Sequence, residues 1–220
     1  MFRALIILSA TLLVAQAQKM PFDANALLKL ARISDPQISP DGQTVAFSVQ
    51  RVDLEKNTRV TQIYVVPAEG GTPRQLTTEG TLNERARWSP DAKKIAWISN
   101  RGGTSQVWLM DADGTHARRV TGISTEAGGV VFSPNGKQLF FTSEVYPDCP
   151  DDACNKQKLA ASDDSKVKAR EYTSLLYRHW TKWQSARRKH ILVVDVEGGV
   201  PKDLTPGGYD VPPFSLGGPD

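Results

Sequence analysis

The sequence predicts an all-β fold: a partial β-propeller of four-stranded antiparallel blades, three complete and a fourth begun, with a helix-containing insertion in the third. Three observations predict it. A Ser-Pro-Asp or Ser-Pro-Asn turn recurs three times in the 220 residues, and an aromatic residue follows each serine eight positions later. A second apolar run then leads, after twelve residues, to an apolar residue followed by threonine. Fixed spacings separated by a variable gap indicate one repeated supersecondary unit, with length changes confined to one loop.

Each repeat opens on a turn that its own residues specify. The openings are Ser39–Gly42, Ser89–Ala92 and Ser133–Gly136. Proline presets φ, the aspartate or asparagine side chain bonds to nearby backbone amides, and glycine tolerates a positive φ. The second opening has Ala92 where the others have glycine. If the same backbone conformation is kept there, we expect a cost of about 1–2 kcal/mol.

Apolar runs of strand length follow each turn. The first run of each repeat is centred on Phe47, Trp97 and Phe141, and the second on Tyr64, Trp108 and Leu192. The closing pairs are Leu76-Thr77, Val120-Thr121 and Leu204-Thr205. With the segment before each serine, these runs make about four strands per repeat, as in a propeller blade. We expect the blades at about 38–80, 86–123 and 129–206. A generic meander or sandwich is the alternative.

The N-terminus has the pattern of an export signal. A short basic start is followed by the uncharged stretch Ala4–Ala15 and the small-x-small site Ala15-Gln16-Ala17. We therefore expect a signal peptide over residues 1–17, cleaved after Ala17, and a periplasmic or secreted protein. The stretch is shorter than the roughly 20 apolar residues of a membrane span. An uncleaved anchor is the alternative. Residues 18–37 then supply an N-terminal helix and lead-in strand, and residues 38–220 the partial propeller.

Charge and cysteines set further expectations. The formal net charge is only +3, and basic residues are scattered among acids, so no nucleic-acid partner is expected. Cys149 and Cys154 lie five residues apart in an acidic, turn-rich stretch and are candidates for a disulfide, with free thiols as the alternative. Closing so short a loop stabilises by about 2 kcal/mol. The sequence predicts no metal site, since zinc needs four ligands and the nearby aspartates lack a calcium-loop pattern, and it predicts no cofactor.

The third repeat contains a long insertion, at about 145–188. The interval between the two apolar centres is 11 residues in the second repeat but 51 in the third. Its first half reads as polar turns, and apolar residues recur at near-helical spacing over Ser165–Trp183, which predicts a short helix turning into a strand. A strand returning through His190–Leu192 is the alternative. Four residues of this half are candidates for a substrate cavity, where arginine meets a carboxylate and tryptophan offers a stacking face: Arg178, His179, Trp180 and Trp183. Packing of the insertion is the alternative role.

The blade repeat resembles that of TolB-like proteins and of the prolyl oligopeptidase family of serine peptidases. Two further segments resemble the secreted dipeptidyl-peptidase and acylaminoacyl-peptidase branch of that family: the opening Asn25–Leu30 with Ile33–Gly42, and Leu176–Trp183 leading into Arg187–His190. The resemblance runs from about Phe22 to Tyr209.

The resemblance implies a propeller that caps an α/β-hydrolase domain carrying serine, aspartate and histidine in that order. Such a domain needs a Gly-x-Ser-x-Gly nucleophile elbow. The nearest match, Gly122–Glu126, fails at its last position, and none of the histidines at 116, 179 and 190 follows a serine and aspartate in a recognisable order. We therefore assign no catalytic residue to this chain.

The implied function is that of the N-terminal propeller segment of an exported serine peptidase, which removes dipeptides or blocked residues from peptide N-termini. The propeller gates access, and peptide substrates meet the catalytic machinery on a C-terminal hydrolase domain that this chain does not carry. The alternative is a non-catalytic, TolB-like periplasmic propeller that binds protein partners. Because propellers close with about four to eight blades, and Tyr209–Ser215 resembles the start of a fourth blade, we expect a part or remnant of a longer protein.

Overall fold

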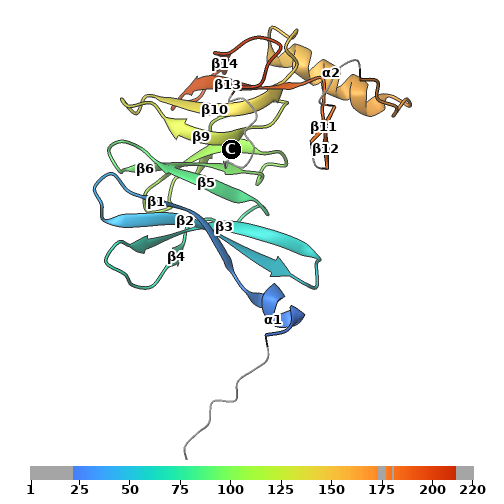
Figure 1. Ribbon diagram of the computed structural model, residues 1–220. Coiled ribbons are helices and arrows are strands. Elements are labelled where there is room, and N and C mark those ends of the chain that lie inside the picture. The colour runs from blue at the N-terminus through green and yellow to red at the C-terminus, as the bar shows by residue number, and fades with distance from the viewer. Residues whose placement is uncertain (1–21, 173–176, 180, 212–220) are drawn as a thin grey trace, which may run out of the picture. The chain divides into compact units, whose positions relative to one another are not determined.

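The computed structural model describes residues 22–172, 177–179 and 181–211 (Figure 1). The predicted signal peptide therefore lies outside the described residues. Helix α1 (Ala24–Lys29) falls within the expected lead-in segment and begins after Asp23, whose carboxylate accepts a hydrogen bond from the backbone N–H of Ala26 at 2.8 Å. It belongs to a unit ending at Leu30, separate from the unit that holds the sheets. No helix within the described residues is long and apolar enough to cross a membrane.

Three four-stranded antiparallel sheets follow one another along the chain, each with its strands in sequence order. Blade one contains β1 (Arg32–Ile38), β2 (Thr44–Asp53), β3 (Thr58–Pro67) and β4 (Arg74–Gln75). Blade two contains β5 (Asn83–Trp88), β6 (Lys94–Ser99), β7 (Gln106–Asp111) and β8 (Arg118–Arg119). Blade three contains β9 (Gly128–Phe132), β10 (Gln138–Val145), β13 (Arg188–Asp195) and β14 (Lys202–Asp203). The predicted fold class is confirmed. Of the expected fourth-blade strand, residues 212–215 lie outside the described residues, and residues 209–211 are not in a strand.

The opening turns are held by the serine that begins each of them. In blade two the Ser89 hydroxyl donates to Asp91 Oδ1 at 2.6 Å and accepts the backbone N–H of Lys94 at 2.9 Å. The turns that begin at Ser39 and Ser133 have the same two hydrogen bonds. Ala92 keeps the left-handed conformation of its glycine counterparts, with φ of 59°, so the expected strain is present.

The closing threonines explain the second fixed spacing. The hydroxyls of Thr77, Thr121 and Thr205 accept the backbone N–H groups of Ile63, Val107 and Ile191 at 2.9, 2.9 and 3.0 Å. Each blade's last strand pairs over only two residues, so the threonine continues the hydrogen bonding of the third strand beyond it. The threonine must therefore stand at one register position relative to that strand, and this fixes the twelve-residue interval.

The first strand of each blade carries a bulge that the sequence did not reveal. Asp35, Arg85 and Gly129 each lie four residues before the turn serine and have φ of 51°, 58° and 45°. The strand register shifts at each of these positions. Since β1 contacts β5 and β5 contacts β9, the bulged strands of neighbouring blades lie next to one another. The bulge bends and twists these strands.

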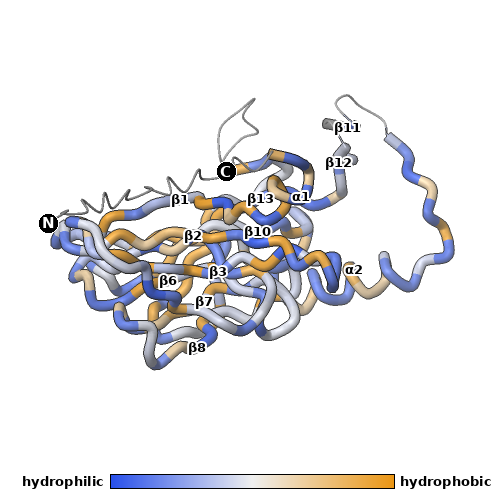
Figure 2. The backbone as a smooth tube through the Cα atoms, turned by 90° about the horizontal axis from the view of Figure 1, so that it is seen from below, coloured by the Kyte–Doolittle hydropathy of each residue, from blue (hydrophilic) through white to orange (hydrophobic). Residues whose placement is uncertain are grey.

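Two buried apolar clusters hold the blades together. One joins blades one and two and includes the fully buried Trp97, whose indole N–H donates to Asn83 Oδ1 at 3.0 Å. The other joins blades two and three around Leu109 and Phe141. Figure 2 shows apolar residues concentrated along the strands, whereas polar residues prevail just after α2. Each pair of neighbouring blades therefore shares a buried apolar cluster, as expected for a propeller.

The insertion differs from the prediction in the place of its helix. Helix α2 spans Asp152–Asp164, in the half predicted to be turns, and the segment Ser165–Tyr172 is not helical. The prediction was wrong because α2 has no apolar stripe to reveal it: its one buried residue is Asn155. Good helix formers and an aspartate N-cap specify it instead. The strand that was expected next exists as β11 (Arg178–His179), but it pairs with β12 (Lys182–Trp183) and not with β13.

Candidate functional site: the insertion in blade three

The base of the insertion is fixed to the propeller at several points. The predicted disulfide between Cys149 and Cys154 is present, with Cα atoms 5.4 Å apart, and it ties the incoming chain to the first turn of α2. At the same end of the helix, the Asp152 carboxylate accepts hydrogen bonds from the backbone N–H and the hydroxyl of Ser124, at 2.8 and 2.9 Å. Buried Asn155 accepts the backbone N–H of Tyr146 at 2.8 Å. These contacts anchor α2 to the connection between blades two and three.

The hydrogen bonds of Ser124 also show its role in Gly122–Glu126, the nearest match to a nucleophile elbow. The Ser124 hydroxyl donates to the carboxylate of Asp152, the first residue of α2, and no histidine is among its hydrogen-bond partners. A serine nucleophile needs a base within hydrogen-bond reach. Ser124 therefore has a structural role.

The second half of the insertion forms a small hairpin with an aromatic cluster. Arg178 and Trp183 are cross-strand partners, and the guanidinium carbon lies 5.2 Å from the centroid of the indole ring. The Trp183 ring stacks on Tyr172 and Tyr177, with centroids 6.0 and 6.1 Å apart and interplanar angles of 17° and 21°. The Tyr172 hydroxyl donates to the backbone carbonyl of Gln184 at 3.0 Å and so fixes its ring. Arg178 and Trp183 are thus brought together as predicted candidates.

A cleft of about 570 Å³ lies beside this cluster, lined by Lys168, Arg170, Tyr172, Tyr177 and Trp183. Tyr177 and Trp183 remain 44% and 43% exposed, so their rings are available to a ligand. The cleft therefore combines two cationic side chains with three aromatic rings.

The structure describes only part of the predicted candidate set. The backbone of His179 pairs with Lys182 in the hairpin, while Trp180 lies outside the described residues. Sequence reasoning named Tyr172 and Tyr177 only as apolar positions and did not assign Lys168 or Arg170 to a site. Cations stand at alternate positions 166, 168 and 170, just before Tyr172, and this pattern is the signal that could have found them.

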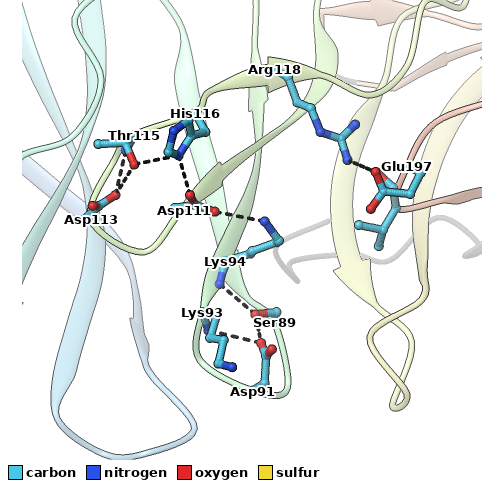
Figure 3. Close-up of polar contacts among 11 residues, drawn as sticks. Ser89, Asp91, Lys93, Lys94, Asp111, Asp113, Thr115, His116, Arg118 and Glu197 are labelled. Carbon is cyan, nitrogen blue, oxygen red and sulfur yellow. Dashed lines mark hydrogen bonds and ion pairs between the residues drawn. The ribbon is translucent and has the colours of Figure 1, made fainter.

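A second cleft, of about 680 Å³, lies at the turn end of blades two and three, near the polar contacts drawn in Figure 3. Arg118 of β8 donates to the carbonyl of Val196 at 2.7 Å and to Glu197 at 3.2 Å, which ties blade two to blade three. Asp111 accepts from Lys94 at 2.9 Å and contacts His116 Nδ1 at 2.7 Å. The hydrogen bond from Lys94, and then that from His116, hold the pKa of Asp111 below its ordinary value of 3.8.

These contacts have a structural role: they hold neighbouring strands and blades together. His116 is exposed in its turn and has the role of a surface partner for Asp111. Among the residues that the structure describes, no group of three or more histidine, cysteine or acidic side chains is placed to hold a metal ion.

Blade three holds a buried histidine, His190, in a position that glutamine fills in the other blades. Gln62 and Gln106 accept from the closing threonine and donate to a backbone carbonyl just beyond it, Gly80 or Ile123. The equivalent residue, His190, directs Nε2 at the carbonyl of Gly207, 2.9 Å away, and Nδ1 at Asp203 Oδ2, 2.6 Å away. The histidine thus replaces a structural amide. It is not part of a catalytic arrangement.

The three packed four-stranded sheets define a partial β-propeller with a long insertion in its third blade. The chain belongs to the TolB beta propeller domain family, whose profile matches residues 28–169.

Its relatives include peptidases. It is 32% identical to the dipeptidyl-peptidase 5 of Porphyromonas endodontalis over 157 residues, which is 71% of this chain and 22% of that protein. The dipeptidyl-peptidase 5 of Porphyromonas gingivalis is 33% identical over 156 residues, with the same coverage. The chain thus spans about a fifth of the length of these relatives.

The Pyrococcus horikoshii acylaminoacyl peptidase has a similar fold, with a TM-score of 0.61, 18% identity, and coverage of 84% of this chain and 27% of that one. The homologous regions are the N-terminal propeller parts of peptidases.

Proposed function

We propose that this chain is the propeller segment of an exported serine peptidase that removes dipeptides or blocked residues from peptide N-termini, and that it controls which substrates reach a hydrolase domain. The observation that carries the proposal is the 32% identity to a dipeptidyl-peptidase over 71% of the chain. Neighbouring blades share buried apolar clusters and are joined by ion pairs such as that between Arg87 and Asp35 at 2.7 Å. A rigid propeller of this kind excludes folded proteins sterically and admits short or flexible peptides.

The test uses the polypeptide encoded by the complete reading frame that contains this chain. Chromogenic dipeptides with free N-termini and blocked amino acids are offered as substrates, and a fluorophosphonate probe reports a reactive serine. We expect hydrolysis of one of these substrate classes and labelling by the probe. We expect no cleavage of a folded protein whose N-terminus has the same residues as the cleaved substrate. Without labelling and hydrolysis, the peptidase assignment fails, and a TolB-like propeller that binds protein partners becomes the better description.

Gating is tested separately in that polypeptide. Breaking a blade-to-blade tie with Arg87→Ala is expected to raise the rate on a long unfolded protein relative to the rate on a dipeptide, because the propeller then excludes less. Lys56→Ala, which removes an exposed cation from the β2–β3 loop of blade one, is the matched control and leaves the ratio unchanged. An unchanged ratio in both variants contradicts gating by the blade packing.

Export is the remaining part of the proposal. It rests on the basic start, the uncharged stretch and the Ala15-Gln16-Ala17 site. N-terminal sequencing of the protein from periplasm or medium is expected to begin at Gln18. Recovery in the cytoplasm with Met1 intact refutes it.

A further inference from the structure

The expectation that basic residues are scattered among acids is wrong for one segment, where the positive charge is concentrated. Residues 166–190 hold eight of the 27 Lys and Arg residues and one of the 24 Asp and Glu residues. That segment therefore has a formal charge of +7, whereas the remainder of the chain has −4. Like charges this dense repel one another and extend a chain unless something anionic offsets them.

The side chains that line the cleft in this segment could bind such an anion at a specific site. Lys168 and Arg170 are exposed cations that line it, and Arg170 presents a planar guanidinium suited to a carboxylate. The rings of Tyr172, Tyr177 and Trp183 line the rest of the cleft. At about 570 Å³, the cleft is within the range of about 300–1,000 Å³ typical of small-ligand pockets.

The ring cluster is built in a way that favours binding. The Tyr172 hydroxyl is bonded to Gln184, and the Gln184 backbone N–H donates to the carbonyl of Tyr177 at 2.9 Å, so the hairpin sets the ring positions. Rings ordered in advance lose little conformational entropy when a ligand stacks on them. Packing alone does not require two of the three to keep more than two-fifths of their surface exposed.

We infer that the cleft bounded by Lys168, Arg170, Tyr172, Tyr177 and Trp183 binds an acidic peptide segment, with its carboxylates at the two cations and an aromatic or other large apolar side chain against the rings. That the ligand is a peptide rests on the proposed function; its negative charge and its ring-binding group follow from the cleft. Under the proposed function, this cleft selects acidic substrates.

The test measures binding to the purified chain by fluorescence anisotropy, with no hydrolysis involved. The probe is a fluorescein-labelled Glu-Asp-Phe-Glu-Asp peptide; the comparison peptides replace its phenylalanine with alanine or its acids with lysine and arginine. We expect the acidic aromatic peptide to bind about tenfold more tightly than either comparison peptide, since loss of one stacked ring or one ion pair in a cleft costs about this factor. Binding weakens as salt rises.

Variants assign the binding to the cleft. Trp183→Leu and Arg170→Glu are each expected to weaken binding about tenfold. Arg59→Glu reverses an exposed arginine on β3 and changes the net charge equally, so it controls for non-specific attraction and stays within about twofold. Arg170 lies in a non-helical, exposed stretch, so its variant tests the site even if Trp183→Leu disturbs the hairpin.

Two results overturn the inference. The first is equal binding by the basic peptide, or equal affinity of Arg170→Glu and Arg59→Glu. The second is displacement of the peptide by a single-stranded oligonucleotide that binds more tightly, which would assign the cleft to a nucleic acid. Since binding is measured on this chain without catalysis, failure of the peptidase assay leaves the result unaffected.

Discussion

Blades two and three share one plan and differ at one junction. In blade two the second and third strands are joined by residues 100–105, whereas in blade three they are joined by residues 146–187. The strand register is unbroken in both: β6 pairs with β7 from Lys94 to Ser99, and β10 with β13 from Gln138 to Val145. The comparison teaches that a blade accepts a large insertion where two paired strands leave the sheet together. The strand pairing that stabilises the blade is kept within the sheet, whereas the exposed cationic and aromatic residues of the insertion lie outside it.

The largest expected effect on the free energy of unfolding comes from a substitution in the core of blade two, the blade without the insertion. Trp97→Ala in blade two is expected to lower the free energy of unfolding by about 3–5 kcal/mol, because it empties a fully buried site and leaves Asn83 without its indole partner. Trp183→Ala, in the insertion, is expected to change it by less than about 1 kcal/mol. Denaturant unfolding measures both. Equal losses would show that the insertion is part of the core.

The next test concerns the histidine that replaces glutamine. His190→Leu leaves Asp203 and the Gly207 carbonyl without their partner and is expected to cost about 2–3 kcal/mol. His190→Gln restores the residue of the other two blades, so we expect it to recover most of that loss. If glutamine is as damaging as leucine, the blades do not share this contact.

The disulfide is expected to matter less and only locally. Replacing Cys149 and Cys154 with serine removes a stabilisation of about 2 kcal/mol from the base of the insertion. Hydrogen exchange is expected to speed up in α2 and to stay unchanged in β6 and β7. Faster exchange in blade two would mean that the insertion and the regular blade are not independent.

Two substitutions in the opening turns are expected to have smaller and opposite effects on stability. Ala92→Gly is expected to stabilise the protein by about 1 kcal/mol, because alanine at a φ of 59° is strained. Gly42→Ala is expected to destabilise it by a similar amount; its added Cβ meets no atom within 4 Å, so the effect is purely conformational. Thermal unfolding of the two single variants and the double variant checks this, and the double variant should fall near the parent.

The smallest expected effect is a difference in pH dependence between the opening turns of blades two and three. The Ser89 hydroxyl, and then the Lys93 backbone N–H, hold the pKa of Asp91 below 3.8, whereas blade three has Asn135 at that place. A lowered folded-state pKa gives stability that is present above the unfolded value and lost as the pH falls through the folded one. Protection of the Lys93 amide is therefore expected to drop below about pH 4 while that of Lys137 holds. Asp91→Asn should abolish the difference, and a drop at both amides contradicts this origin.

Residue patterns predicted the blades well because their rules are local or of fixed register. The turn serines, the buried Trp97 and the threonines that bond to the third strand were all found from spacing. The bulges at Asp35 and Arg85 were not, since a left-handed residue within a strand leaves no apolar pattern. Helix α2 was misplaced because it is largely exposed and polar. Of the periodic aromatic residues that suggested a helix, Tyr172, Tyr177 and Trp183 instead gather at a hairpin.

The sequence by itself determined the repeated blade and its turns and named the two cysteines as disulfide candidates, because turn chemistry, strand spacing and residue identity can be read along the chain. The structure decided between a disulfide and free thiols. Only the tertiary structure decided that Ser124 hydrogen-bonds Asp152 at the start of α2, that His190 occupies the position of a glutamine in the other blades, and that Lys168 and Arg170 share a cleft with three rings. Those facts depend on which distant groups meet. Their meeting is set by the folding of the whole chain into packed sheets and turns, which no local pattern specifies.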